Sequence, residues 1–164
     1  MTRKGKGYGV PENQTYFVYE TGFCRITIVS DSSAVLAVLF GNAVNPGGKK
    51  EASALTDLAA EQLVEYFAGK RKQFDVPIRP VGTDFQEAVW KALLNIPYGE
   101  TRSYKQIAQE IGSPAACRAV GMANNKNPIS IIIPCHRVIG SNGALVGYGG
   151  GLEMKQKLLA LEQK

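Results

Sequence analysis

Residues 69–82 separate two regions whose apolar residues follow different patterns. This segment holds two prolines and two glycines and has no clear period, as linkers between domains do. Before it, short runs of β-branched and aromatic residues favour strands, and after it apolar residues recur at helical spacing. We therefore predict a first domain over residues 1–78, with its linker ending at about residue 82, and a second domain over residues 79–164.

The first domain is predicted to be an α/β unit. Three strands are expected at residues 16–19, 24–29 and 34–40, and the short turns between them favour an antiparallel sheet. A helix with one apolar face is expected over residues 55–67, where it would cover the sheet. Cys24 shares a face of the second strand with two isoleucines, so we expect it in the core.

The second domain is predicted to be mainly α-helical. A capping box at Thr83 begins a helix that ends before Pro97, and a second capping box at Ser103 begins the next helix. Ser113 is the expected cap of a third helix that reaches about Asn124. The second and third helices, joined by a Gly-Ser turn, form a candidate helix-turn-helix.

The third helix, over residues 114–124, consists largely of small residues such as Ala119 and has one long cation, Arg118. A helix that reads bases in the major groove needs several hydrogen-bonding side chains, and this helix offers almost none. A thin helix can instead approach the minor groove, where backbone contacts dominate. Alternatively, the small residues pack the helix tightly against Trp90 and the core, and both interpretations can hold for different faces of the helix.

The composition is that of a compact intracellular protein. With 164 residues, of which 45% are hydrophobic, the chain can bury a sizeable core, and its apolar runs are far shorter than the roughly 20 residues of a membrane span. The basic residues 1–7 are not followed by the apolar run of a secretory signal, and three cysteines are too few for a disulfide framework. A net charge of +5 permits a polyanionic partner without establishing one.

The chemistry of the chain is concentrated around Cys135 and the only histidine, His136. They follow an apolar run at residues 129–133, which is expected to be a buried strand stopped by Pro134. An adjacent imidazole can activate a thiol nucleophile. Neighbours along a strand face opposite sides, so the pair can cooperate only if Pro134 breaks the strand or a water bridges the two groups. We favour the break together with a bridging water.

The pair also allows two other interpretations. Cys135 can be an inert buried cysteine and His136 a surface histidine whose hydrogen bonds are satisfied. A metal site is disfavoured, because Cys24, Cys117, Cys135 and His136 show none of the spacings typical of structural zinc. We therefore expect no metal.

The motif Pro-Cys-His-Arg at residues 134–137 belongs to a longer set of segments, which includes residues 67–71, 82–86, 96–101, 118–121, 127–128 and 147–152. This set closely resembles the methylated-DNA-protein-cysteine methyltransferases, also called O6-alkylguanine-DNA alkyltransferases. The resemblance covers nearly everything from residue 60 to residue 162. It implies a ribonuclease-H-like α/β domain followed by a mainly α-helical domain with a winged-helix-like helix-turn-helix.

The resemblance also implies roles for individual residues of the reaction. Cys135 would accept the alkyl group from O6 of guanine as a thioether, and His136 would take the thiol proton through a water. Glu162 would orient His136, whereas its place at the edge of an apolar helix stripe alone permits partial burial or plain solvation. Tyr104 would assist nucleotide rotation and donate a proton or hydrogen bond to the departing base. Asn127 would tie the third helix to the cysteine segment.

Further roles concern DNA and the pocket. Arg118 would fill the gap left by the flipped nucleotide, and Ala119 and Lys126 would contact the DNA. The pocket would be walled by Tyr148, Val146 and Gly149. Val146 and Gly149 depart from residues common in the family, and Arg137 is expected to be a structural salt-bridge partner.

The predicted function is direct repair of O6-alkylguanine in duplex DNA. The resemblance implies a single transfer per molecule, no cofactor, a monomer without membrane association, and a place in the cytoplasm, or in the nucleus of a eukaryote. Action on O4-alkylthymine stays open. One alternative is an alkyltransferase-like protein that binds damage without transfer, although such proteins lack the reactive cysteine. Another is a cysteine hydrolase that uses Cys135 and His136 on a small ester or amide.

Overall fold

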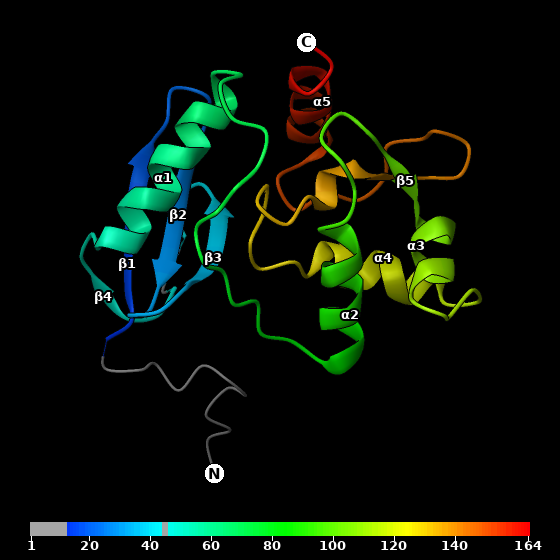
Figure 1. Ribbon diagram of the computed structural model, residues 1–164, viewed down its shortest axis with the longest axis horizontal. Coiled ribbons are helices and arrows are strands. Elements are labelled where there is room, and N and C mark those ends of the chain that lie inside the picture. Colours follow the sequence, from blue (N-terminus) through cyan, green and yellow to red (C-terminus); the bar gives the residue numbers. More distant parts are fainter. Residues whose placement is uncertain (1–12, 44–45) are drawn as a thin grey trace. The chain divides into compact units, whose positions relative to one another are not determined.

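The computed structural model describes residues 13–43 and 46–164. The described residues form two compact units, one that ends at residue 81 and one over residues 82–164 (Figure 1). Residues 1–7, on which the exclusion of a secretory signal rests, lie outside the described residues. Within the described ranges, no helix is long and apolar enough to cross a membrane.

The first unit contains a four-stranded sheet with the order β3-β2-β1-β4. The three predicted strands are confirmed as β1 (Thr15–Glu20), β2 (Arg25–Ser30) and β3 (Val35–Phe40), which pair antiparallel. The fourth strand, β4 (Lys49–Lys50), was not predicted and pairs parallel with β1. Two lysines have no alternating pattern from which a strand could be recognised.

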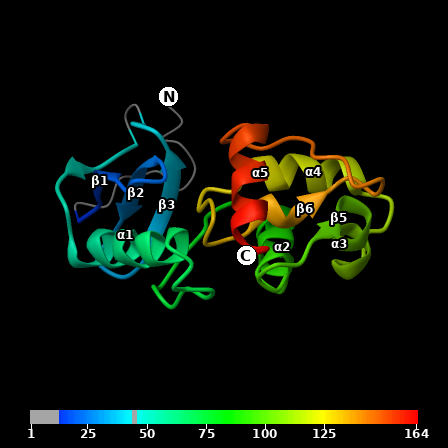
Figure 2. The ribbon, with the colours of Figure 1, turned by 90° about the horizontal axis from the view of Figure 1, so that it is seen from above.

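Helix α1 (Ala54–Phe67) lies against the sheet in both views (Figures 1 and 2). Its first turn is fixed by a capping box between Ser53 and Thr56, and it buries Leu63 and Tyr66 completely. The helix therefore covers the sheet as its apolar period predicts.

Cys24 is half-buried and lies outside the strand, so its prediction as a core residue was wrong. The reason is a turn: the Thr21 hydroxyl accepts a hydrogen bond from the Cys24 amide at 3.1 Å and donates one to the Cys24 carbonyl at 2.6 Å. This turn ends before β2 begins at Arg25.

Part of the segment over residues 69–82 is bonded to the first unit. The Val35 amide donates to the Pro77 carbonyl at 2.8 Å, and the Arg79 amide donates to the Val35 carbonyl at 2.9 Å. This short parallel bridge satisfies backbone groups along the outer side of β3. The stretch around Pro77 is therefore held on the sheet instead of forming free chain.

The second unit is built around four helices, α2 (Asp84–Leu93), α3 (Tyr104–Glu110), α4 (Cys117–Asn125) and α5 (Leu152–Leu161). Figure 2 shows their arrangement. The capping boxes expected at the starts of α2 and α3 are both present, with reciprocal side-chain and backbone hydrogen bonds. Trp90 of α2 is buried, and its indole N–H donates to the Ala123 carbonyl of α4 at 2.8 Å, which fixes α4 against α2.

The third predicted helix starts later than expected. Its cap is Ala116, which makes no capping hydrogen bond through its side chain, and Ser113 caps nothing. The Ala116 amide bonds to the Ser113 carbonyl at 2.9 Å, so residues 113–116 form a separate turn before α4. The pair α3 and α4 remains as the helix-turn-helix.

The apolar run at residues 129–133 is a tight loop, so the predicted strand was wrong. The Ile133 amide bonds back to the Ile129 carbonyl at 3.0 Å, and Ile131 has a φ of 73°, which a β-branched residue rarely adopts. The loop is followed directly by the short 3₁₀ helix η1 (Cys135–Arg137). The break expected at Pro134 is therefore real, although the chain before it is already irregular.

A two-stranded parallel sheet forms between β5 (Arg102–Ser103) and β6 (Val138–Ile139). It was not predicted, since each strand has only two residues. Its position matters, because β5 leads into α3 and β6 follows η1 directly. The sheet thus ties the start of the helix-turn-helix to the cysteine segment.

Candidate active site

Two carboxamides hold the backbone around Cys135. The Asn127 amide group donates to the Ile133 carbonyl at 2.8 Å, and its oxygen accepts from the Ile129 amide at 3.0 Å. Asn124, on α4, donates to the Cys135 carbonyl at 3.2 Å. These hydrogen bonds stabilise the loop conformation, which the positive φ of Ile131 alone would disfavour. They also join α4 to the cysteine segment.

The Cys135 thiol is almost completely buried, with 4% of the residue exposed. Burial raises its pKa to about 11, although a hydrogen bond from the Asn127 side chain and the positive charge of Lys155 act in the opposite direction. The thiol is therefore protonated at neutral pH. A reaction at this sulfur needs a base that removes the proton as the nucleophile attacks.

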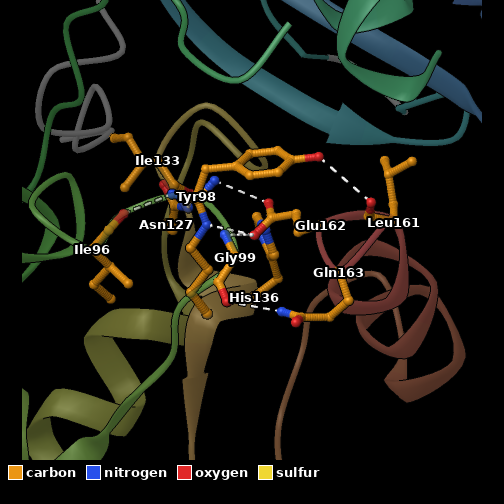
Figure 3. A network of polar contacts seen from close by, with 10 residues as sticks. Ile96, Tyr98, Gly99, Asn127, Ile133, His136, Leu161, Glu162 and Gln163 are labelled. Carbon is orange, nitrogen blue, oxygen red and sulfur yellow. Dashed lines mark hydrogen bonds and ion pairs between the residues drawn. The ribbon is translucent and has the colours of Figure 1, made fainter. Parts of the chain in front are cut away.

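His136 is the base that the fold provides. Its Nε2 lies 2.8 Å from Oε2 of Glu162, and both side chains are buried (Figure 3). Burial lowers the pKa of His136 despite the neighbouring carboxylate, so the imidazole is neutral and its Nε2–H donates to Glu162. The other nitrogen, Nδ1, is buried and has no hydrogen-bond partner among the described residues, which leaves its lone pair available for a proton.

Arg137 holds Glu162 from the other side. Its Nε and Nη2 donate to the two carboxylate oxygens at 2.8 and 2.9 Å, and its Nη1 donates to the Ile96 carbonyl at 2.7 Å. The guanidinium also lies 5.7 Å from the centre of the Tyr98 ring. Glu162 is thus a fixed anion. The burial of Glu162, which the sequence alone left open, is explained by its ion pair with Arg137.

Tyr104 and Arg118 line a cavity of about 330 Å³ on the helix-turn-helix. The remaining lining residues are Cys117, Gly121, Asn125, Val146 and Gly147. The Tyr104 hydroxyl donates to the Val146 carbonyl at 2.9 Å, and burial raises the pKa of this phenol above its usual value. A phenol that keeps its proton can act as a donor in the cavity.

The remaining predicted site residues are Ala119, Lys126, Tyr148 and Gly149. Ala119 on α4 and Lys126 just after it are exposed, and their contact with DNA stays a prediction. Tyr148 is half-buried and Gly149 is exposed, and neither is among the residues that line the cavity. The structure therefore unites Cys135, His136, Glu162 and Asn127 in one buried cluster, and Tyr104, Arg118 and Val146 around one cavity.

Sequence reasoning missed two residues of this region. Lys155 is completely buried, and Met122 on α4 is 68% exposed. Lys155 had a readable signal, because it precedes Leu158 by three positions and Glu162 by seven and so shares their helix face. Met122 interrupts the small residues of its helix, and that departure from the pattern was its signal.

The described residues contain no group of three or more His, Cys, Asp or Glu side chains that could hold a metal ion.

Comparison with known proteins identifies both units. Residues 15–80 match the model of the 6-O-methylguanine DNA methyltransferase ribonuclease-like domain, and residues 84–164 match that of the DNA binding domain of the same family. The predicted fold class is confirmed by these two matches. The crystal structure of Mycobacterium tuberculosis OGT in complex with DNA superposes with a TM-score of 0.85 at 47% identity, over 91% of this chain and 92% of that chain.

Curated relatives agree with these matches. A methylated-DNA–protein-cysteine methyltransferase from Methanosarcina barkeri is 65% identical over 105 residues, which span 64% of this chain and 66% of the relative. One from Mycobacterium tuberculosis is 63% identical over 105 residues, 64% of each chain. Each match therefore spans just under two-thirds of the relative's length. The chain belongs to the O6-methylguanine DNA methyltransferase family.

Proposed function

We propose that this protein repairs duplex DNA by transferring the O6-alkyl group of guanine to Sγ of Cys135. The observation that carries this proposal is the buried thiol followed directly by a neutral imidazole, which is itself held at 2.8 Å by Glu162. The names of the relatives, and a structural neighbour bound to DNA, support the same reaction. No cofactor is needed, because the sulfur is both nucleophile and final acceptor.

The transfer follows from the chemistry of the cluster. Nδ1 of His136 accepts the thiol proton through a water, and Glu162 stabilises the imidazolium that forms. The thiolate then attacks the alkyl carbon, a C–S bond forms and the C–O bond to guanine breaks. Tyr104 donates a hydrogen bond or a proton to the leaving base, whose anion would otherwise leave poorly.

The reaction should occur once per molecule. The product at Cys135 is a thioether, which is a poor leaving group, and the described cluster contains no second cysteine that could take over the alkyl group. Repair is therefore stoichiometric. This property separates the proposed activity from that of a cysteine hydrolase, which regenerates its thiol in every cycle.

DNA binding is assigned to the second domain, residues 79–164. Helix α4 would approach the minor groove with its small residues, Ala119 and Lys126 would contact the DNA, and Arg118 would fill the space of the flipped nucleotide. The flipped base would enter the cavity at Tyr104. Because the thiol is only 4% exposed, the base can reach it only after the neighbouring chain has moved. We assign Val146, Tyr148 and Gly149, of which only Val146 lines the cavity, to the wall of the pocket that then forms.

We further assign the protein a monomeric state on DNA and a place in the cytoplasm, or in the nucleus of a eukaryote, where its substrate is found. Its partner is duplex DNA with O6-alkylguanine. Duplexes with O4-alkylthymine are the natural second substrate to assay.

The test is the intact mass of the protein after brief incubation with duplex DNA that contains one O6-methylguanine. We expect a gain of one methyl group that saturates at one per chain. Cys135→Ala should show no gain, whereas Cys24→Ala, which changes a half-buried cysteine of the first unit, should gain the group fully. An undamaged duplex serves as the second control. Tight binding to damaged DNA without a mass gain would instead indicate a damage-recognition protein, and many repaired guanines per protein would exclude a single-use acceptor.

A further inference from the structure

The loop at residues 96–99 contacts both members of the buried ion pair between Arg137 and Glu162. It lies between α2 and β5 in the chain. The Ile96 carbonyl accepts a hydrogen bond from Arg137, and the Gly99 amide donates one to Oε1 of Glu162 at 3.3 Å (Figure 3). The loop therefore holds the anion as well as the cation of the pair.

With Gly99, the Glu162 carboxylate accepts four hydrogen bonds. Its Oε1 accepts from the Gly99 amide and from Nε of Arg137, and its Oε2 accepts from Nη2 of Arg137 and from Nε2 of His136. A carboxylate has about four acceptor positions in all. Donors on every side therefore fix the orientation in which Oε2 faces the imidazole.

The residues at the end of α5 bind the same loop. The side-chain amide of Gln163 donates to the Gly99 carbonyl at 2.8 Å, and the Tyr98 hydroxyl makes a long hydrogen bond of 3.5 Å to the Leu161 carbonyl (Figure 3). Gly99 thus uses its amide for Glu162 and its carbonyl for Gln163. We call these contacts between the loop and residues 161–163 the clasp.

The clasp requires glycine at position 99. The Glu100 amide bonds to the Pro97 carbonyl at 3.1 Å, so residues 97–100 form a turn, in which Gly99 has a φ of 81°. Residues with a side chain rarely adopt this conformation. A Cβ atom here would also lie 3.2 Å from the Glu162 carbonyl oxygen. Glycine therefore lets the turn approach the end of α5 closely enough for both hydrogen bonds.

The position of Glu162 in its helix explains why the carboxylate needs such contacts. Glu162 is the C-cap of α5. Helix ends fray, and the partial negative charge at the C-terminal end of a helix disfavours a nearby anion. The helix alone would not hold a carboxylate at this point, so the placement of Glu162 depends on partners outside α5.

We propose that Gly99 and Gln163 are positioning residues of the alkyl transfer, which join the end of α5 to the loop at residues 96–99 and so keep the Glu162 carboxylate on Nε2 of His136. This inference rests on the proposed function. Neither residue contacts the reacting atoms. Both act through Glu162, which engages Nε2–H and leaves Nδ1 as the nitrogen that accepts the thiol proton.

The first test is the single-turnover rate of methyl transfer at saturating damaged duplex. Gln163 is exposed, so Gln163→Ala should fold, and Gln156→Ala removes an exposed glutamine of α5 as the matched control. We expect Gln163→Ala to slow transfer roughly three- to tenfold, the effect of one lost hydrogen bond, with an unchanged Kd for DNA. Gly99→Ala, which disturbs two hydrogen bonds, should slow transfer more. Gln156→Ala should react at the wild-type rate.

A double variant separates positioning from a general loss of stability. In the His136→Gln background Glu162 has no imidazole to orient, so the addition of Gln163→Ala should not slow transfer further. If Gln163→Ala slows transfer equally with and without His136, the proposal is overturned. A wild-type rate in Gln163→Ala would overturn it as well.

A second measurement needs no DNA. His136 is the only histidine of the sequence, so ¹⁵N NMR of the untagged protein reports on its two ring nitrogens alone. We expect the wild-type protein to show a proton on Nε2 that exchanges slowly with water, and Gln163→Ala to show faster exchange and an upfield shift of that proton. An unchanged signal would contradict the clasp. If the signal changes as expected but the wild-type protein gains no methyl group from damaged DNA, it is the proposed function that has failed.

Discussion

Glu162 joins two buried side chains, since it accepts hydrogen bonds from both His136 and Arg137. Glu162→Gln removes the charge and leaves the Arg137 guanidinium buried without an ionic partner. Breaking a buried pair in this way typically costs ~3–5 kcal/mol of stability, and loss of the oriented imidazole should slow methyl transfer by about 100-fold. Thermal unfolding and single-turnover kinetics measure the two effects. Glu153→Gln, on the exposed face of α5, should change neither.

His136 should make the stability of the protein depend on pH. Its pKa is lowered in the folded protein by burial, from an ordinary value of 6.5. Below pH 6.5 the unfolded chain therefore binds a proton that the folded protein refuses, and the free energy of unfolding falls by up to ~1.4 kcal/mol per pH unit until the folded-state pKa is reached. Urea unfolding of the wild-type protein and of His136→Gln between pH 5 and pH 7 isolates this contribution. Equal slopes in the two proteins would contradict it.

The sequence predicted the members of the buried cluster better than their surroundings. Cys135, His136 and Asn127 were found because a reactive thiol beside the only histidine is a local signal in the chain. Lys155 was not found, although its helix face gave a signal for burial, because the two backbone carbonyls that satisfy its ammonium come to it only in the folded chain. Hydrogen bonds between groups far apart in the sequence leave no local pattern, unlike the capping boxes.

At the scale of helices and strands, predictions succeeded where the determinants are local. The capping boxes of α2 and α3 are interactions over three residues, and both are present. The strand predicted at residues 129–133 was wrong, because four isoleucines and one serine suit a buried strand as well as a buried loop. What decides between them is Asn127, whose side chain bonds the loop backbone at both ends. The two-residue strands β5 and β6 are too short for any period.

Helix α4 presents one large apolar side chain on its exposed surface. Met122 is 68% exposed and lies one turn after Arg118, so the two side chains share a face. Apolar side chains of this kind contact sugars and base steps in the minor groove. Met122→Ala should therefore weaken binding to duplex DNA by roughly three- to tenfold, as expected for the loss of a buried thioether. Leu94→Ala, which removes a 47% exposed side chain after α2, is the control and should bind like the wild-type protein.

At the scale of the whole molecule, all features of the candidate site belong to one of the two units. The buried cluster, the cavity and the helix-turn-helix all lie within residues 82–164, which form one compact unit. The break between the two apolar patterns was readable in the sequence because each unit has its own core, with Tyr66 and Leu63 in one and Trp90 and Leu93 in the other. No sequence pattern encodes how much of the segment between them stays bonded to β3.

The whole chain carries a net charge of +5, so we expect its affinity for DNA to depend on salt concentration. For undamaged duplex DNA, log Kd should rise linearly with the logarithm of the salt concentration. The reason is that each cationic side chain that contacts a phosphate releases a counterion. Lys126→Gln should reduce the slope by about one, since Lys126 is exposed directly after α4. Met122→Ala should shift the line without changing its slope, because an apolar contact releases no counterion. Lys157→Gln, whose ammonium faces Glu153, is the control. A slope unchanged in Lys126→Gln would place the phosphate contacts elsewhere on the chain and would contradict the docking of α4 proposed here.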